Sequence, residues 1–194
     1  NAARIRMLDA AAPNPSVETL LHAFLPHKFI DHSHADAILA TVDQAEAVAL
    51  AGEIHGERLA IVPYIMPGFA LAKLAAEVYE KHPNCEGLLL LQHGLFTFGE
   101  TAQESYERHI AAVLRCEAYL ARAAQTPARS QECRAQSPYH RLAPLLRGAL
   151  GPTRYLFDLR SEPAVRRFVD RSDLAEVACR GPVTPDHVIR ARPA

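Results

Sequence analysis

Residues 87–99 read GLLLLQHGLFTFG, the most informative stretch for the fold. The leucine run at residues 88–91 is continuous rather than alternating, which is typical of a strand buried on both faces. Residues 94–99 begin and end with glycine and are expected to form the second strand of a hairpin. Because strands of this kind alternate with helical patterns along the chain, we expect a layered α/β domain.

Upstream of this stretch, helical and strand-like patterns alternate. Ser16 is a good N-cap and Pro26 a stop signal for a first helix, and we expect a turn at Gly52. Helices are expected at residues 17–25, 35–40, 44–51 and 69–81, and strands at residues 29–34 and 58–65.

Downstream, residues 100–125 have the spacing of one long helix. Its expected buried stripe consists of Tyr106, Ile110, Val113, Leu114, Tyr119 and Leu120. Residues 126–137 are polar and rich in helix breakers, so they are a candidate linker. We therefore predict one domain at residues 1–125 and a helical extension at residues 126–194, with short helices at 139–148 and 162–171 and an extended tail after Gly181.

The bulk composition is that of an ordinary globular protein. The 194 residues are 49% hydrophobic and 22% charged, enough to bury a core. A net charge of −1 gives no reason to expect binding to nucleic acid or to a membrane. The four cysteines form no CxxC pair, and the sequence contains neither a bilayer-length apolar run nor a signal-peptide pattern, so we expect a cytoplasmic protein.

The sharpest local feature is His32-Ser33-His34. In a strand, residues i and i+2 point to the same face, so two imidazoles here could bind one metal ion. Each ligating histidine would need a partner that fixes its tautomer, and spacing alone assigns none. Two surface histidines without a common ligand are the alternative interpretation.

Two further residues could join such a site. His93 lies directly after the buried strand, where sites of α/β proteins often lie, although a lone histidine there is more often a packing or capping residue. Glu18 lies at the expected start of a helix, where a carboxylate is also an ordinary partner of the helix dipole. Three imidazoles with an open fourth position would be typical of a catalytic zinc site.

With these residues identified, the chain resembles the class II aldolase/adducin family over roughly residues 13–125. The resemblance is carried in order by PSVE at residues 15–18, HSH at 32–34, VPY at 62–64 with Gly68, and QHGL at 92–95. It implies a layered α/β/α domain with a central, mainly antiparallel sheet. It also implies Zn²⁺ or another divalent metal on His32, His34 and His93, Glu18 as catalytic acid/base, and Ser16 as a phosphate-binding residue.

The resemblance implies a lyase that cleaves a ketose 1-phosphate of the rhamnulose or fuculose type to dihydroxyacetone phosphate and a small aldehyde. Members are often homo-oligomers, including tetramers. The chain most resembles the aldolase half of bifunctional rhamnulose-phosphate aldolase/short-chain dehydrogenase proteins, but it has no GxGxxG. The family's opening segment, with its phosphate loop, has no counterpart here, so an N-terminally truncated domain is expected.

Three alternatives share these residues. An epimerase or a decarboxylase on the same scaffold would use the same metal ligands. A non-catalytic interaction module, as in the adducin branch, would not need all three histidines and Glu18. A catalytically incompetent fragment of a bifunctional aldolase/dehydrogenase would keep the metal site and lose the reaction.

Overall fold

The computed structural model describes residues 4–123, 139–182, 184 and 187. The chain divides into two compact units, one of residues 1–125 with 182–193 and one of residues 126–181 with 194. The candidate linker at 126–137 and most of the expected extended tail lie outside the described residues. The division into domains at residues 125 and 126 stays a prediction.

A four-stranded sheet forms the centre of the first unit. Its strands are β1 (Phe29–Ser33), β2 (Leu59–Val62), β3 (Gly87–Leu90) and β4 (Gly94–Gly99), in the order β1-β4-β3-β2. β4 pairs antiparallel with both β1 and β3, whereas β2 pairs parallel with β3. The mainly antiparallel sheet that was predicted is therefore confirmed.

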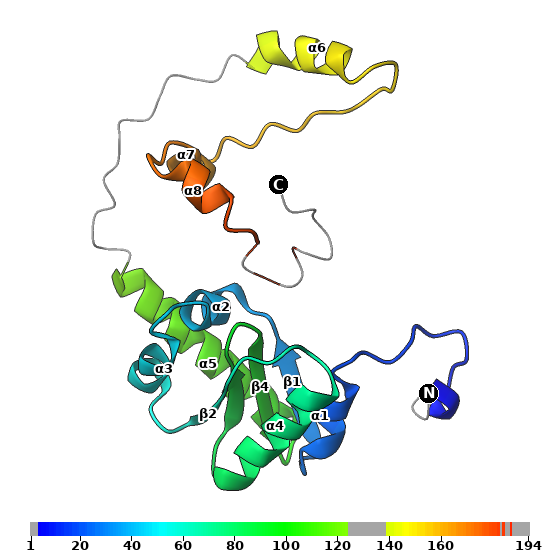
Figure 1. The fold of residues 1–194 in the computed structure, drawn as a ribbon, viewed down its shortest axis with the longest axis vertical. Coiled ribbons are helices and arrows are strands. Elements are labelled where there is room, and N and C mark those ends of the chain that lie inside the picture. Colours follow the sequence, from blue (N-terminus) through cyan, green and yellow to red (C-terminus); the bar gives the residue numbers. More distant parts are fainter. Residues whose placement is uncertain (1–3, 124–138, 183, 185–186, 188–194) are drawn as a thin grey trace. The chain divides into compact units, whose positions relative to one another are not determined.

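Helices cover both faces of this sheet (Figure 1). One layer consists of α1 (Thr19–Phe24) and α4 (Phe69–Lys81). The other consists of α2 (Asp36–Val42), α3 (Ala47–His55) and α5 (Ala102–Ala123). A short 3₁₀ turn, Arg4–Arg6, precedes them in the chain. The three layers match the predicted α/β/α architecture.

Each face of the sheet has its own hydrophobic core, because successive strand residues point to opposite sides. Leu88 and Leu90 of β3 pack in the core with α1 and α4, together with Phe96 of β4. Leu89 and Leu95 pack in the other core, with α2, α3 and α5. The uninterrupted run of apolar residues is thus explained by burial on both faces.

Helix α3 differs from the sequence prediction at its end. It continues through Gly52 to His55, and Gly56, with φ +61°, terminates it. A glycine inside a helix costs only about 1 kcal/mol relative to alanine, so Gly52 alone does not end the helix. The left-handed conformation at the end of the helix instead falls on the second glycine. The expected turn at Gly52 was therefore wrong.

The buried face of α5 also differs from the prediction. Its buried residues are Ser105, His109, Ala112 and Cys116, at helical spacing. Of the stripe expected to be buried, Tyr106 is 60% exposed and Leu114 55% exposed. Small and polar side chains face the sheet because α5 packs against β1 and β4, and they form hydrogen bonds with strand residues there.

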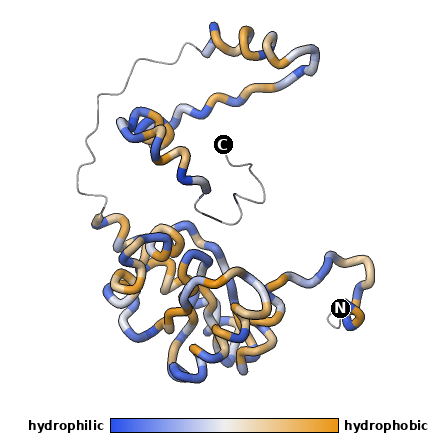
Figure 2. Tube along the Cα trace, viewed as in Figure 1, coloured by the Kyte–Doolittle hydropathy of each residue, from blue (hydrophilic) through white to orange (hydrophobic). Residues whose placement is uncertain are grey.

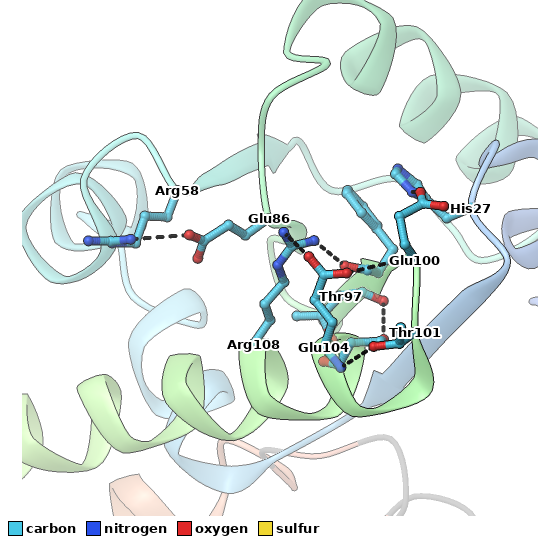
Figure 3. A network of polar contacts seen from close by, with 10 residues as sticks. His27, Arg58, Glu86, Thr97, Glu100, Thr101, Glu104 and Arg108 are labelled. Carbon is cyan, nitrogen blue, oxygen red and sulfur yellow. Dashed lines mark hydrogen bonds and ion pairs between the residues drawn. The ribbon is translucent and has the colours of Figure 1, made fainter.

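The start of α5 is fixed by a polar network (Figure 3). Thr101 Oγ1 accepts the backbone N–H of Glu104 at 3.1 Å, as an N-cap side chain does. The Glu104 carboxylate in turn accepts the N–H of Glu100 at 2.8 Å and pairs with Arg108 at 2.6 Å. Arg108 also donates to the carbonyl of Phe98 at 2.6 Å. The helix is thereby joined to the end of β4.

The second unit contains α6 (Tyr139–Ala149), α7 (Pro163–Val169) and α8 (Leu174–Ala178). The first two confirm the helices expected at 139–148 and 162–171, while α8 was not predicted. Hydrophobic and hydrophilic residues alternate along α6 (Figure 2). Among the helices in the described part of the chain, none is both long and apolar enough to cross a bilayer.

Candidate metal centre

His32 and His34 lie at the end of β1. His32 is the residue of this strand that pairs with Phe96 of β4, and its ring stacks on the Phe96 ring with centroids 3.9 Å apart. His34 follows Ser33, the last residue of the strand. The imidazoles lie on the same side, as the i, i+2 spacing predicts, with 3.0 Å between their Nε2 atoms.

His93 comes from the tight connection between β3 and β4. The N–H of His93 donates to the carbonyl of Leu90 at 3.2 Å, and Gln92 between them has φ +55°. This left-handed backbone at a non-glycine residue turns the chain sharply at the strand end. The side chain of His93 is 5% exposed, so the turn places a buried imidazole beside the other two.

Glu18 precedes α1, and its carboxylate does not cap that helix. It points instead to the three histidines. Its Oε1 lies 2.9 Å from Nε2 of His93, 3.3 Å from Nε2 of His32 and 3.7 Å from Nε2 of His34. The carboxylate therefore makes no capping hydrogen bond and belongs to the histidine cluster.

The four side chains form one compact group. One ligand atom from each of Glu18, His32, His34 and His93 lies within 4.8 Å of every other. Nitrogens bound at roughly 2.0–2.1 Å to one tetrahedral zinc ion are about 3.3 Å apart. The distances of 2.9 to 3.7 Å between Glu18 and the three imidazoles bracket that separation. The residues therefore fit a divalent metal.

The outer contacts of the cluster orient the ligand atoms. His32 Nδ1 lies 2.9 Å from the carbonyl oxygen of Leu95, which can only accept, so Nδ1 carries the proton and Nε2 faces the cluster. A backbone carbonyl in this position is a frequent partner of a metal-ligating histidine. This is the tautomer-fixing partner that the spacing could not assign.

Contacts with the histidines stabilise the charged form of Glu18. Hydrogen bonding with His32 and then with His93 holds the pKa of the Glu18 carboxyl well below its usual range, although partial burial opposes this effect. A metal ion would bind the imidazole nitrogens in their deprotonated form, as metal ligands do.

Gly94 makes room for the cluster. A Cβ atom on Gly94 would lie 2.4 Å from the backbone oxygen of Ser33 and 3.1 Å from Cδ2 of His34. Both distances are too short for ordinary contact, so a side chain at this position would displace the end of β1. The glycine after His93 thus has a steric role that sequence analysis did not identify.

Ser16 lies near the cluster in sequence but uses its hydroxyl locally. Its Oγ accepts the N–H of Glu18 at 3.1 Å, which shapes the turn that presents the carboxylate. Ser33, Thr97 and His109 form a further set of hydrogen bonds that no motif in the sequence predicts. Its only signal in the sequence is the spacing of Ser105, His109, Ala112 and Cys116 along α5.

Comparison with known proteins is consistent with this architecture. The family model described as Class II Aldolase and Adducin N-terminal domain matches residues 2–120, and that of the aldolase class II second domain matches residues 137–194. YuxG of Bacillus subtilis (strain 168), described as an uncharacterized oxidoreductase, is 43% identical over 114 residues, which are 59% of this chain and 16% of that protein.

Two solved structures are similar to this chain, and the first of them, at 44% identity, supports the same relationship. The N-terminal class II aldolase domain of a conserved protein from Thermoplasma acidophilum is 44% identical, with a TM-score of 0.55, and the match covers 60% of this chain and 54% of that one. An aldolase II superfamily protein from Pseudomonas syringae is 16% identical with a TM-score of 0.47, covering 69% of this chain and 63% of that one. The chain thus spans only part of the length of each relative. With the first family model matching more than half of its residues, the chain belongs to the class II aldolase and adducin family.

Proposed function

We propose that this chain is the metal-binding part of an aldolase that cleaves a ketose 1-phosphate, of the rhamnulose or fuculose type, to dihydroxyacetone phosphate and a small aldehyde. The observation that carries the proposal is the approach of one Glu18 carboxylate oxygen to the Nε2 atoms of three histidines. Three imidazoles with an open fourth position are typical of a catalytic zinc site, and a carboxylate beside that position can serve as an acid/base.

His32, His34 and His93 would hold the divalent metal, with Zn²⁺ as the first candidate. When bound, it would supply Lewis acidity that stabilises negative charge on the carbonyl and hydroxyl oxygens of the substrate. A catalytic site of this type needs an open coordination position. We infer that Glu18, next to that position, serves as acid/base rather than as a permanent ligand.

Glu18 would move the proton that the cleavage requires. Cleavage breaks the bond between the carbon next to the carbonyl and the hydroxyl-bearing carbon beyond it. That hydroxyl gives up its proton as it becomes the aldehyde carbonyl, and the electron pair stays on the carbon of the ketone fragment, to which Glu18 would deliver a proton. In the synthetic direction it would remove the same proton. The reaction needs no further reactant, because the ketose phosphate supplies all atoms of both products.

Phosphate recognition is assigned to Ser16 as part of this proposal. Ser16 is exposed and lies two residues before Glu18, the proposed acid/base, in the sequence. Because Oγ accepts the N–H of Glu18, its own proton is free to be donated to a phosphate oxygen. Replacement by alanine would therefore raise KM for the phosphorylated substrate more than it would lower kcat.

The test is to incubate the zinc-loaded chain with several ketose 1-phosphates and measure release of dihydroxyacetone phosphate. Glu18→Gln is expected to lower kcat at least about 100-fold, as loss of a general acid/base does, while bound zinc is retained. The matched control is Glu100→Gln, on an 84% exposed side chain outside the cluster. If no full-length protein that contains this domain releases dihydroxyacetone phosphate, the aldolase assignment is wrong. Formation of an epimerase or decarboxylase product would favour that alternative, and release by a full-length protein but not by this chain would identify the chain as a catalytically incompetent fragment.

A further inference from the structure

Ser33 lies between the two histidines of β1 and points to the opposite face of the strand. Its Oγ lies 2.6 Å from Nε2 of His109, which is 76 residues away in α5. His109 is 8% exposed, so this contact is nearly shielded from water. The peptide that links His32 to His34 is therefore attached to a helix on the far side of the sheet from the cluster.

Each hydrogen bond in this set has a defined direction. The hydroxyl of Thr97 donates to the carbonyl of Ser105 at 3.1 Å, so Thr97 Oγ1 must accept from Nδ1 of His109 at 2.9 Å. Burial lowers the pKa of His109, which keeps the imidazole neutral and Nε2 unprotonated. Nε2 therefore accepts the hydroxyl proton of Ser33, and the chain runs in one direction from Ser33 to Ser105.

The hydrogen bond between Ser33 and His109 lies at the end of β1, where the pairing of the strand with β4 stops. Ser33 is the last residue of β1, and α2 begins only at Asp36, so His34 lies in the short connection between them. The backbone oxygen of Ser33 also lies against Gly94, at the distance where any Cβ would collide. The Ser33 peptide is thus fixed from both sides, and with it the relative placement of the two imidazoles.

We propose that His109 is a positioning residue that sets the metal affinity of the site by holding Ser33, and with it the His32–His34 pair, in place. The inference rests on the metal site proposed above and not on the reaction assigned to it. A ligand pair held in the binding geometry loses less conformational freedom when metal binds. Loss of a residue that orients metal ligands typically weakens metal binding about 10- to 100-fold.

The test is the dissociation constant of Co²⁺, measured by its visible absorption in competition with a chelator, on the full chain. His109→Leu and Ser33→Ala are each expected to weaken Co²⁺ binding about tenfold. The double variant should be no weaker than either single variant, because both remove the same contact. Ser33→Thr keeps the hydroxyl and should restore the affinity of the unmodified chain.

Cys116→Ala is the matched control for a merely structural effect. Cys116 is buried on the same face of α5, 7 residues after His109, and its loss should lower the unfolding midpoint while leaving Co²⁺ affinity unchanged. Should His109→Leu not fold, Ser33→Ala decides the question alone. Unchanged affinity in folded Ser33→Ala or His109→Leu, or additive losses in the double variant, would overturn the inference. Unchanged affinity in His93→Ala would instead overturn the metal site, and the inference with it.

Discussion

At the scale of single residues, the space around Gly94 decides whether the imidazoles can meet. A methyl group at this position would lie 2.4 Å from the backbone oxygen of Ser33, so Gly94→Ala must push β1 away from β4. We expect a loss of roughly 1–3 kcal/mol in unfolding free energy, as for other overpacked positions, together with weaker metal binding. Urea unfolding and a zinc titration measure the two effects.

The matched control is Gly52→Ala in α3. No atom lies within 4 Å of a Cβ built on Gly52, which is inside the helix. Alanine there should raise the unfolding free energy by roughly 0.5–1 kcal/mol, because alanine loses less backbone entropy than glycine in a helix. Equal effects of the two substitutions would contradict a special role for Gly94.

His55 gives the stability of the fold a pH dependence. Burial, followed by the positive charge of Arg115, lowers the pKa of His55 to about 4. The unfolded imidazole titrates near its ordinary value of about 6.5, so between these values the unfolded state binds a proton that the folded state does not. The unfolding free energy should therefore fall with decreasing pH in this window, by up to about 1.4 kcal/mol per pH unit.

Urea unfolding of metal-free protein between pH 6.5 and 5 would measure this slope in the unmodified chain and in His55→Leu. The variant should show a shallower slope, although burial also lowers the pKa of His109 and His27, so part of the slope remains. Glu18 contributes stability that is present above its unfolded pKa and lost only in more acidic solution. An identical slope in the variant would contradict the assignment to His55.

At the scale of elements, continuous and alternating apolar patterns predicted the strands, whereas the buried stripe of α5 was predicted only in part. Val113 packs against the core as expected, but Tyr106 and Leu114 are exposed. The strands could be predicted because a leucine run buried on both faces has few alternatives. The face of α5 could not, because helical periodicity favoured Ile110 and Leu114 over the smaller Ser105 and Ala112. The orientation of α5 depends on its close packing against β4, and this tertiary contact cannot be predicted from the periodicity of one helix.

Two substitutions on α5 test this corrected orientation. Ala112 is fully buried, so Ala112→Leu should overpack the core and lower the unfolding free energy by roughly 1–3 kcal/mol. Leu114 is 55% exposed, so Leu114→Ala should change it by no more than about 0.5 kcal/mol. If thermal or urea unfolding showed a larger loss of unfolding free energy for Leu114→Ala than for Ala112→Leu, the orientation expected from the sequence would be correct.

The start of α5 offers a separate test of a local interaction. Thr101→Ala removes the acceptor for the N–H of Glu104 and should lower the unfolding free energy by about 1 kcal/mol, as loss of an N-cap does. Thr101→Ser keeps the acceptor and serves as the control. If alanine and serine behave alike, Thr101 does not cap the helix.

At the scale of the whole molecule, the candidate site is assembled from segments far apart in the sequence. The alternation of side chains along a strand predicted that His32 and His34 share a face. Spacing could not place His93 and Glu18 in the same site, because 75 residues separate His93 from Glu18. The family resemblance brought them together as an expectation, and the geometry brings their side chains within hydrogen-bond distance. Contacts such as Ser33 with His109 lie in no motif, so only the folded chain reveals them.

Metal binding should therefore stabilise the first unit of the chain. Because the unfolded chain does not hold these ligands together, zinc at 100 times its dissociation constant should raise the unfolding free energy by about 2.7 kcal/mol. His93→Ala should abolish most of this gain, whereas Cys179→Ser, at an exposed thiol outside the cluster, should keep it. Thermal unfolding with and without zinc measures both. If zinc still raises the unfolding free energy of His93→Ala, the stabilising metal binds elsewhere. If it does not, the metal that stabilises the first unit binds at the residues proposed to perform the chemistry.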